Sequence, residues 1–179
     1  LLAIVVFGFI AERGWTAESA KIRVLITTGG HGFEAAPFFA VFDAMPDVTY
    51  SKATLPEDAD LLKPGLDEKF DVIVRYDMVS AISPQQQKAF VELLHKGIGL
   101  VALHHNLVAH RNWDEYRKII GGKLLLEPTT IDGKEFAKSP YRHDEDLTIH
   151  VVDPQHPITQ GMGDFRIHDE TYGLFYTSP

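Results

Sequence analysis

Residues 97–107 read GIGLVALHHNL, and this stretch decides the fold. A glycine-rich turn leads into a short apolar run, which His104 and His105 follow at once. Apolar runs of this length, bounded by turn residues, are typical of buried strands. Open α/β sheets bind their ligands beyond the carboxyl ends of such strands. The stretch therefore predicts a buried strand that presents two imidazoles at a binding site.

Strand-like and helix-like segments alternate along most of the chain. Strands and helices that alternate form a parallel sheet with right-handed crossovers, so we expect an α/β fold. Residues 123–146 are polar and contain several turn signals, and we expect them to leave the sheet. The expected strands are 21–28, 48–52, 70–76, 97–103, 147–152 and 165–167, and the expected helices are 33–44, 84–96 and 113–120.

Length and composition narrow the class of protein. The 179 residues, 45% of them hydrophobic, suffice for one globular domain, which we place at residues 21–179. The net charge is −8, and this disfavours a nucleic-acid partner, whose backbone needs a basic surface. The chain has no cysteine, which excludes disulfides, thiolate zinc sites and a cysteine nucleophile.

The first ten residues, LLAIVVFGFI, form an apolar run that Glu12 and Arg13 end. This run is too short to span a bilayer, but it matches the apolar core of a secretory signal, with Ala17–Ser19 as a cleavage site. We therefore exclude residues 1–20 from the fold and expect an exported, periplasmic or extracellular protein. If the run is instead a strand or helix of the domain, the protein is expected in the cytoplasm. We expect no other membrane contact.

Polar residues recur where the expected strands end. His31 lies in a Gly29–Gly32 turn, Asp77 follows the third strand, and Asp169 and Glu170 follow the last one. Carboxyl ends of parallel strands meet at one edge, so these groups should converge with the two histidines in one crevice. Imidazoles and carboxylates together form either a divalent metal site or an acid–base pair. Taken singly, each residue could equally be a solvated side chain or a turn residue.

The order of these motifs resembles that of the ThuA-like (trehalose-utilisation) family over about residues 21–176. The resemblance implies a flavodoxin-like, doubly wound, mainly parallel sheet with helices on both faces, as in the class I glutamine amidotransferase-like superfamily. Amidotransferases carry a cysteine after the strand that here is GIGLVAL, and because this chain has none, thiolate amidotransfer is excluded. The motifs are GGHGFE, FDVIVRYDM, GIGLVALHHN, W-x-E-Y-x-x-I-I-G-G, HPITQGM and DFRIHDETY.

The resemblance also implies which residues act. The recurrent polar positions of the family match His31, Asp77, His104, Asp169, Glu170 and Tyr172, whereas the family usually has a small residue at position 105. We predict catalytic roles for Asp77, His104 and Glu170, and a divalent metal such as zinc on His31, His104 and Glu170. The predicted substrate-binding residues are Gly30, His31, Gly32, Phe33, His105, Asn106, Asp169 and Tyr172.

Three functions are compatible with this pattern. The family is linked to disaccharides such as trehalose and to keto-sugars, so we expect a carbohydrate hydrolase or lyase, with or without a metal. The alternatives are a carbohydrate-binding domain without catalysis and a structural or regulatory domain that has lost its site. The expected partner is a small carbohydrate, and a homo-oligomer is left open. Family members usually continue past the DE-x-Y segment, so we expect the domain to be truncated at its C-terminus.

Overall fold

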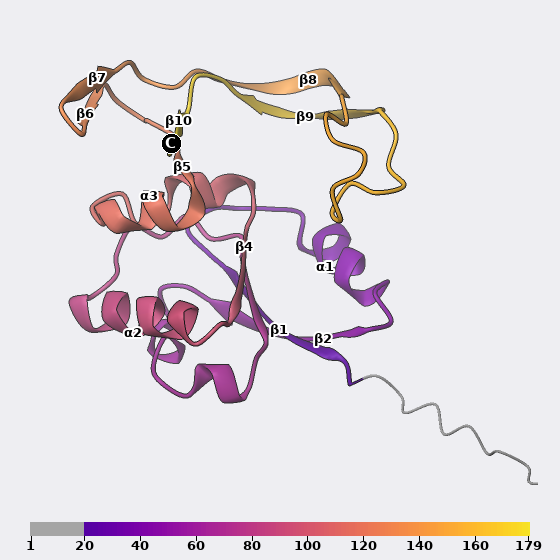
Figure 1. The fold of residues 1–179 in the computed structure, drawn as a ribbon, viewed down its shortest axis with the longest axis vertical. Coiled ribbons are helices and arrows are strands. Elements are labelled where there is room, and N and C mark those ends of the chain that lie inside the picture. Colours follow the sequence, from indigo (N-terminus) through magenta and orange to yellow (C-terminus); the bar gives the residue numbers. More distant parts are fainter. Residues whose placement is uncertain (1–19) are drawn as a thin grey trace, which may run out of the picture.

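A computed structural model describes residues 20–179 and confirms the predicted α/β class. Its central sheet has four parallel strands in the order β2-β1-β3-β4, with helices between them along the chain (Figure 1). β1 is an inner strand of the sheet. β2 lies on one side of it, and β3 and β4 lie on the other. The strands are β1 (Ile22–Thr28), β2 (Val48–Thr54), β3 (Val72–Arg75) and β4 (Gly99–Ala102).

The helices fall where the sequence predicts them. The second helix begins at a capping box, in which Ser83 Oγ accepts from the amide of Gln86 and Gln86 Oε1 accepts from the amide of Ser83. Pro84 occupies its first turn, where no amide hydrogen is needed. The helices are α1 (Ala35–Asp43), α2 (Pro84–His95) and α3 (Asp114–Ile120), with 3-10 turns η1 (Ala59–Leu61), η2 (Leu66–Glu68) and η3 (His104–Val108).

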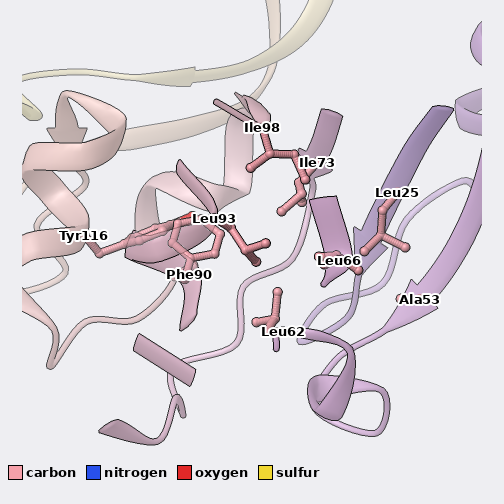
Figure 2. Packing of buried hydrophobic residues seen from close by; sticks show 10 residues of the cluster. Leu25, Ala53, Leu62, Leu66, Ile73, Phe90, Leu93, Ile98 and Tyr116 are labelled. Atoms are coloured by element: carbon pink, nitrogen blue, oxygen red, sulfur yellow. The ribbon is translucent and has the colours of Figure 1, made fainter. Parts of the chain in front are cut away.

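β1 is covered on both faces, and its successive side chains point to these two faces in turn. On one face, Leu25 packs with Phe90 and Leu93 of α2 in the main core (Figure 2). On the other face, Val24 and Ile26 pack in a cluster that includes the aromatic residues of α1. The buried run of β1 therefore serves two cores at once, as expected for a central parallel strand.

The C-terminal part departs from the predicted pattern. Instead of two further strands of the parallel sheet, β8 (Tyr141–Ile149) and β9 (Phe165–Tyr172) pair with each other as an antiparallel ribbon. This β8–β9 ribbon lies across the top of the domain (Figure 1). Two shorter antiparallel pairs complete this part: β5 (Gly122–Lys123) with β10 (Tyr176–Thr177), and β6 (Thr129–Ile131) with β7 (Lys134–Phe136).

The apolar run at the start of the chain lies outside the described residues, so the predicted signal stays a prediction. Among residues 20–179, no helix combines the length and the apolar character needed to cross a membrane.

Candidate functional site

The histidines are presented by a sharp turn at the end of β4. His104 has a backbone φ of 41°, in the left-handed region that residues with a side chain seldom adopt. This conformation costs roughly 1–2 kcal/mol, and such strain is commonly found at functional sites. The chain then closes into η3, whose Asn106 amide donates to the carbonyl of Leu103 over 2.9 Å. The turn therefore places two adjacent imidazoles at the carboxyl edge of the sheet.

Glu170 and Tyr172 reach these imidazoles from the β8–β9 ribbon. They are two residues apart on β9, so both side chains project from the same face of the ribbon. Glu170 Oε2 lies 3.0 Å from His104 Nε2, and the Tyr172 hydroxyl lies 3.0 Å from the same oxygen and 3.1 Å from the same nitrogen. The Tyr172 and His104 rings are stacked, with centroids 4.7 Å apart.

Tyr172 is held as a hydrogen-bond donor. Burial and the hydrogen bond to Glu170 raise the pKa of the Tyr172 hydroxyl well above its usual range. The hydroxyl therefore stays protonated at physiological pH and donates to Glu170, whose carboxylate can only accept. This bond fixes the direction in which the carboxylate faces the histidines.

His105 completes the group as a neutral imidazole. Its Nε2 lies 3.7 Å from Glu170 Oε2. Burial, together with the neighbouring His31 and His104, lowers the pKa of His105 to about 4. The ring is therefore uncharged at neutral pH, and one of its nitrogens carries a free lone pair. The second oxygen of Glu170 lies 3.5 Å from His143 Nδ1, on β8.

The donor set formed by His104, His105 and Glu170 fits a divalent metal ion. One ligand atom from each residue lies within 4.8 Å of the others. Two imidazoles and a carboxylate are a zinc donor set, and they leave a position open for water or substrate. Ligand atoms around a tetrahedral zinc ion are about 3.3 Å apart, given bonds of about 2.0 Å. The imidazole–carboxylate distances of 3.0 and 3.7 Å lie on either side of this value.

His31, predicted as a metal ligand, lies beside this group but faces elsewhere. Its ring packs against His105 with centroids 4.0 Å apart. Its Nε2 lies 2.8 Å from the carbonyl oxygen of Tyr76, and its Nδ1 lies 3.0 Å from that of Gly32. Because carbonyl oxygens only accept, both nitrogens are directed at acceptors rather than at an ion. In this structure, His105 provides the second imidazole instead.

The group opens into a cavity of about 600 Å³ between the sheet edge and the ribbon. Part of its wall is aromatic, where Phe38 and Tyr76 stack with their ring centroids 4.6 Å apart. Three carboxylates, Asp144, Asp169 and Glu170, also line the cavity, and none of the described lining residues is a lysine or an arginine. The lining residues are Gly32, Phe38, Tyr76, His104, His105, His143, Asp144, His168, Asp169 and Glu170.

Two predicted site residues lie inside the protein instead. Asp77 is fully buried, and its carboxylate accepts from Arg75 Nη2 over 2.7 Å, from Arg75 Nε over 3.0 Å and from Thr27 Oγ1 over 2.8 Å. Asn106 is also fully buried and donates to the backbone carbonyl of Asp77 over 3.0 Å. The structure therefore uses both side chains to hold the framework beneath the cavity.

The remaining predicted residues shape the first loop. Gly30 has a φ of 80° and forms the turn before His31, and an added Cβ would lie 3.0 Å from the Met78 carbonyl carbon. The Phe33 ring packs on Tyr76, with centroids 5.4 Å apart. Phe38 and Tyr76 line the cavity but are not among the predicted site residues. Tyr76 directly precedes Asp77 at a strand end, and that position was the available signal.

Comparison with known proteins identifies the family. The pattern of the family described as ThuA, trehalose utilisation, matches residues 15–179. The chain belongs to the ThuA family. It is thus a ThuA-like protein linked to trehalose utilisation, as the order of its motifs indicates. None of the curated proteins matches this ThuA-like chain.

Solved ThuA-like proteins share the fold. A ThuA-like protein from Parabacteroides merdae superposes with a TM-score of 0.67 at 16% identity, over 88% of this chain and 64% of its own length. One from Bacteroides uniformis superposes with a TM-score of 0.61 at 18% identity, over 87% of this chain and 62% of its own. The chain thus spans somewhat less than two thirds of these relatives.

Proposed function

We propose that this ThuA-like protein is a hydrolase or lyase that acts on an uncharged disaccharide or keto-sugar, with a divalent metal ion at His104, His105 and Glu170. The observation that carries the proposal is the meeting of two imidazoles and a carboxylate within 4.8 Å beside a cavity of about 600 Å³. A cavity of this volume accommodates a small-molecule ligand. The printed description of the family supports a carbohydrate as that ligand.

The cavity wall matches the chemistry of a neutral sugar. The apolar face of a sugar ring packs well on aromatic side chains, here Phe38 and Tyr76, and its hydroxyls donate to carboxylates such as Asp144 and Asp169. The described lining residues include Asp144, Asp169 and Glu170 but no lysine or arginine, so away from the proposed ion the side chains of the wall disfavour a phosphate or carboxylate group. An uncharged carbohydrate is therefore favoured over a sugar phosphate or a sugar acid.

The residues of the site have different roles in the proposed reaction. A bound divalent ion would supply Lewis acidity, acidifying a water molecule or polarising a sugar carbonyl. His104, His105 and Glu170 would hold it, and Tyr172 keeps Glu170 oriented through its 3.0 Å hydrogen bond. His143 Nδ1 lies 3.5 Å from the other oxygen of Glu170, and its side chain is largely exposed, so it is accessible to a ligand in the cavity.

The first experiment measures zinc binding and turnover together. Wild-type protein purified without an affinity tag is assayed for bound metal by mass spectrometry and for zinc affinity by calorimetry. It is then screened against neutral disaccharides and their keto derivatives. We expect Glu170→Gln and His105→Ala to lose both metal and activity. The matched controls are Glu135→Gln and His95→Gln, which alter the same residue types at exposed positions on β7 and α2.

The outcomes separate the candidate functions. Metal-dependent product formation that only the site variants lose supports the proposal. Ligand-dependent melting shifts with no product from any sugar would favour the carbohydrate-binding domain, whose support is the aromatic wall. Turnover that is unaffected by metal removal overturns the metal assignment and leaves acid–base catalysis by Glu170 and His104. Absence of both binding and turnover overturns the proposal as a whole.

A further inference from the structure

Asn106 follows the two site histidines in sequence, but unlike them it does not line the cavity. Its side chain is fully buried and therefore cannot reach a sugar in the cavity. Its amide nitrogen donates to the Asp77 carbonyl over 3.0 Å, and its amide oxygen accepts from the hydroxyl of Tyr116. The amide thus uses both its donor and its acceptor group in directional bonds to two different elements.

Both partners of Asn106 are anchored on one buried ion pair. Arg75 Nη2 and Asp77 Oδ1 lie 2.7 Å apart, and both side chains are fully buried. Thr27 of β1 donates to the same carboxylate over 2.8 Å. The Arg75 guanidinium also lies 5.2 Å from the ring centre of Tyr116 in α3. Asn106 is therefore tied to α3 and to the segment that follows β3, at points that the ion pair already contacts.

The residue held by this arrangement is strained. His104 lies two positions before Asn106, and its φ of 41° persists only if the surroundings enforce it. The backbone N–H of Asn106 donates to the carbonyl of Leu103 and so closes the turn. The Asn106 side chain ties the same turn to the segment that follows β3. Backbone and side chain of one residue thus fix the turn that carries both imidazoles.

We infer that Asn106 is a positioning residue that sets where the imidazoles of His104 and His105 meet Glu170. This inference rests on the proposed function, because it concerns the same site. Glu170 arrives on the separate β8–β9 ribbon, so the 3.0 Å contact between His104 Nε2 and Glu170 Oε2 depends on the turn being held in register with that ribbon. A displacement of one ångström would break that hydrogen bond. Supporting residues of this kind typically change metal affinity about 10- to 100-fold when they are removed.

The test uses two variants of the full chain. Asn106→Ala removes both bonds of the amide, and Tyr116→Phe removes only the hydroxyl bond with little change in volume. Asn112→Ala is the matched control, since Asn112 is an exposed asparagine of the same segment. Long-range proton–nitrogen NMR gives the chemical shifts of the His104 imidazole, with His95 of α2 as an internal reference. Nuclear Overhauser effects between the His104 and Tyr172 rings report their contact. Zinc titration by calorimetry gives the affinity.

We expect Asn106→Ala to melt cooperatively but to lose the His104–Tyr172 contact and to bind zinc about 10- to 100-fold more weakly. Tyr116→Phe should shift the same His104 signals by less, while the control and the His95 signal stay unchanged. Folded Asn106→Ala with wild-type His104 signals overturns the inference. If that variant does not fold, Tyr116→Phe decides by the same signals. Absence of zinc binding by the wild type would refute the metal assignment, and the NMR contact would still decide the role of Asn106.

Discussion

Replacing Asp77 by asparagine tests whether this carboxylate supports the fold rather than the chemistry. The substitution preserves shape but removes the charge that faces Arg75, and both side chains are fully buried. Removing one partner of a buried ion pair leaves an uncompensated charge and costs about 3–5 kcal/mol. A domain of this size loses about 2–4 °C of melting temperature per kcal/mol, so we expect a decrease of about 6–20 °C.

Urea unfolding at neutral pH, followed by circular dichroism, measures the free energy directly. The exposed pair of Arg23 and Asp71 provides a matched control, because its Nη2–Oδ1 distance is also 2.7 Å while its side chains are 44% exposed. Water solvates both members of this pair, so Asp71→Asn should cost much less. A double variant, Arg75→Met with Asp77→Asn, should lose less than the sum of the single variants.

The reasoning is refuted if Asp77→Asn unfolds at the same urea concentration as Asp71→Asn. It is also refuted if Asp77→Asn retains wild-type stability but loses turnover and zinc affinity as Glu170→Gln does. The second result would return Asp77 to the catalytic role that its position after a strand predicts.

Three further results are expected. Burial and the neighbouring Arg75 lower the pKa of His110 from 6.5 to about 4, so its contribution to stability is fully present above pH 6.5 and falls by on the order of 3 kcal/mol as the pH drops toward 4. The melting temperature should therefore fall with acid across this range, and it should fall less in His110→Gln. Gly29→Ala places a Cβ 2.1 Å from the Leu55 carbonyl oxygen at a φ of 124°, and should cost at least about 2 kcal/mol in a urea melt, whereas Gly163→Ala, which meets no atom within 4 Å, should leave the midpoint unchanged. A sugar phosphate should bind metal-free protein about tenfold more weakly than the neutral sugar does in calorimetry, and added salt should reduce this difference. Equal affinity would contradict the charge argument.

The central sheet could be predicted from sequence because its strands are short runs rich in apolar and β-branched residues, bounded by turn residues. Lys21–Thr28 corresponds to β1, which is buried from Val24 to Thr28 as predicted. Gly97–Leu103 corresponds to β4, and here the predicted burial is wrong, because β4 is an edge strand whose Val101 is 43% exposed. The capping signals of Ser83 and Pro84 likewise identify the start of α2, since they satisfy amide groups locally. Both kinds of signal are local in the chain, and the strand and helix positions that they predict are confirmed.

The site was only partly predictable because its geometry depends on contacts between distant residues. The sequence suggested that Glu170 follows a strand of the parallel sheet, whereas it lies within β9 of the antiparallel ribbon. The role of Asp77 depends on Arg75, which occurs in an otherwise apolar strand two residues earlier. A buried cation in a strand needs a buried anion nearby, and side chains two residues apart project to the same face. The two-residue spacing between Arg75 and Asp77 therefore indicates a buried ion pair.

The ribbon that supplies Glu170 and Tyr172 has a consequence for how the protein opens. A two-stranded ribbon is marginally stable by itself, and β8 and β9 contact mainly each other rather than the sheet. Local opening of this ribbon therefore requires less free energy than unfolding of the four-stranded core. His104 and His105 would stay in place during such an opening, whereas Glu170, Tyr172 and His143 would leave with the ribbon. Assembly of the complete site is thus a reversible event separate from folding, and slow amide exchange in β1 beside fast exchange in β9 would be its signature.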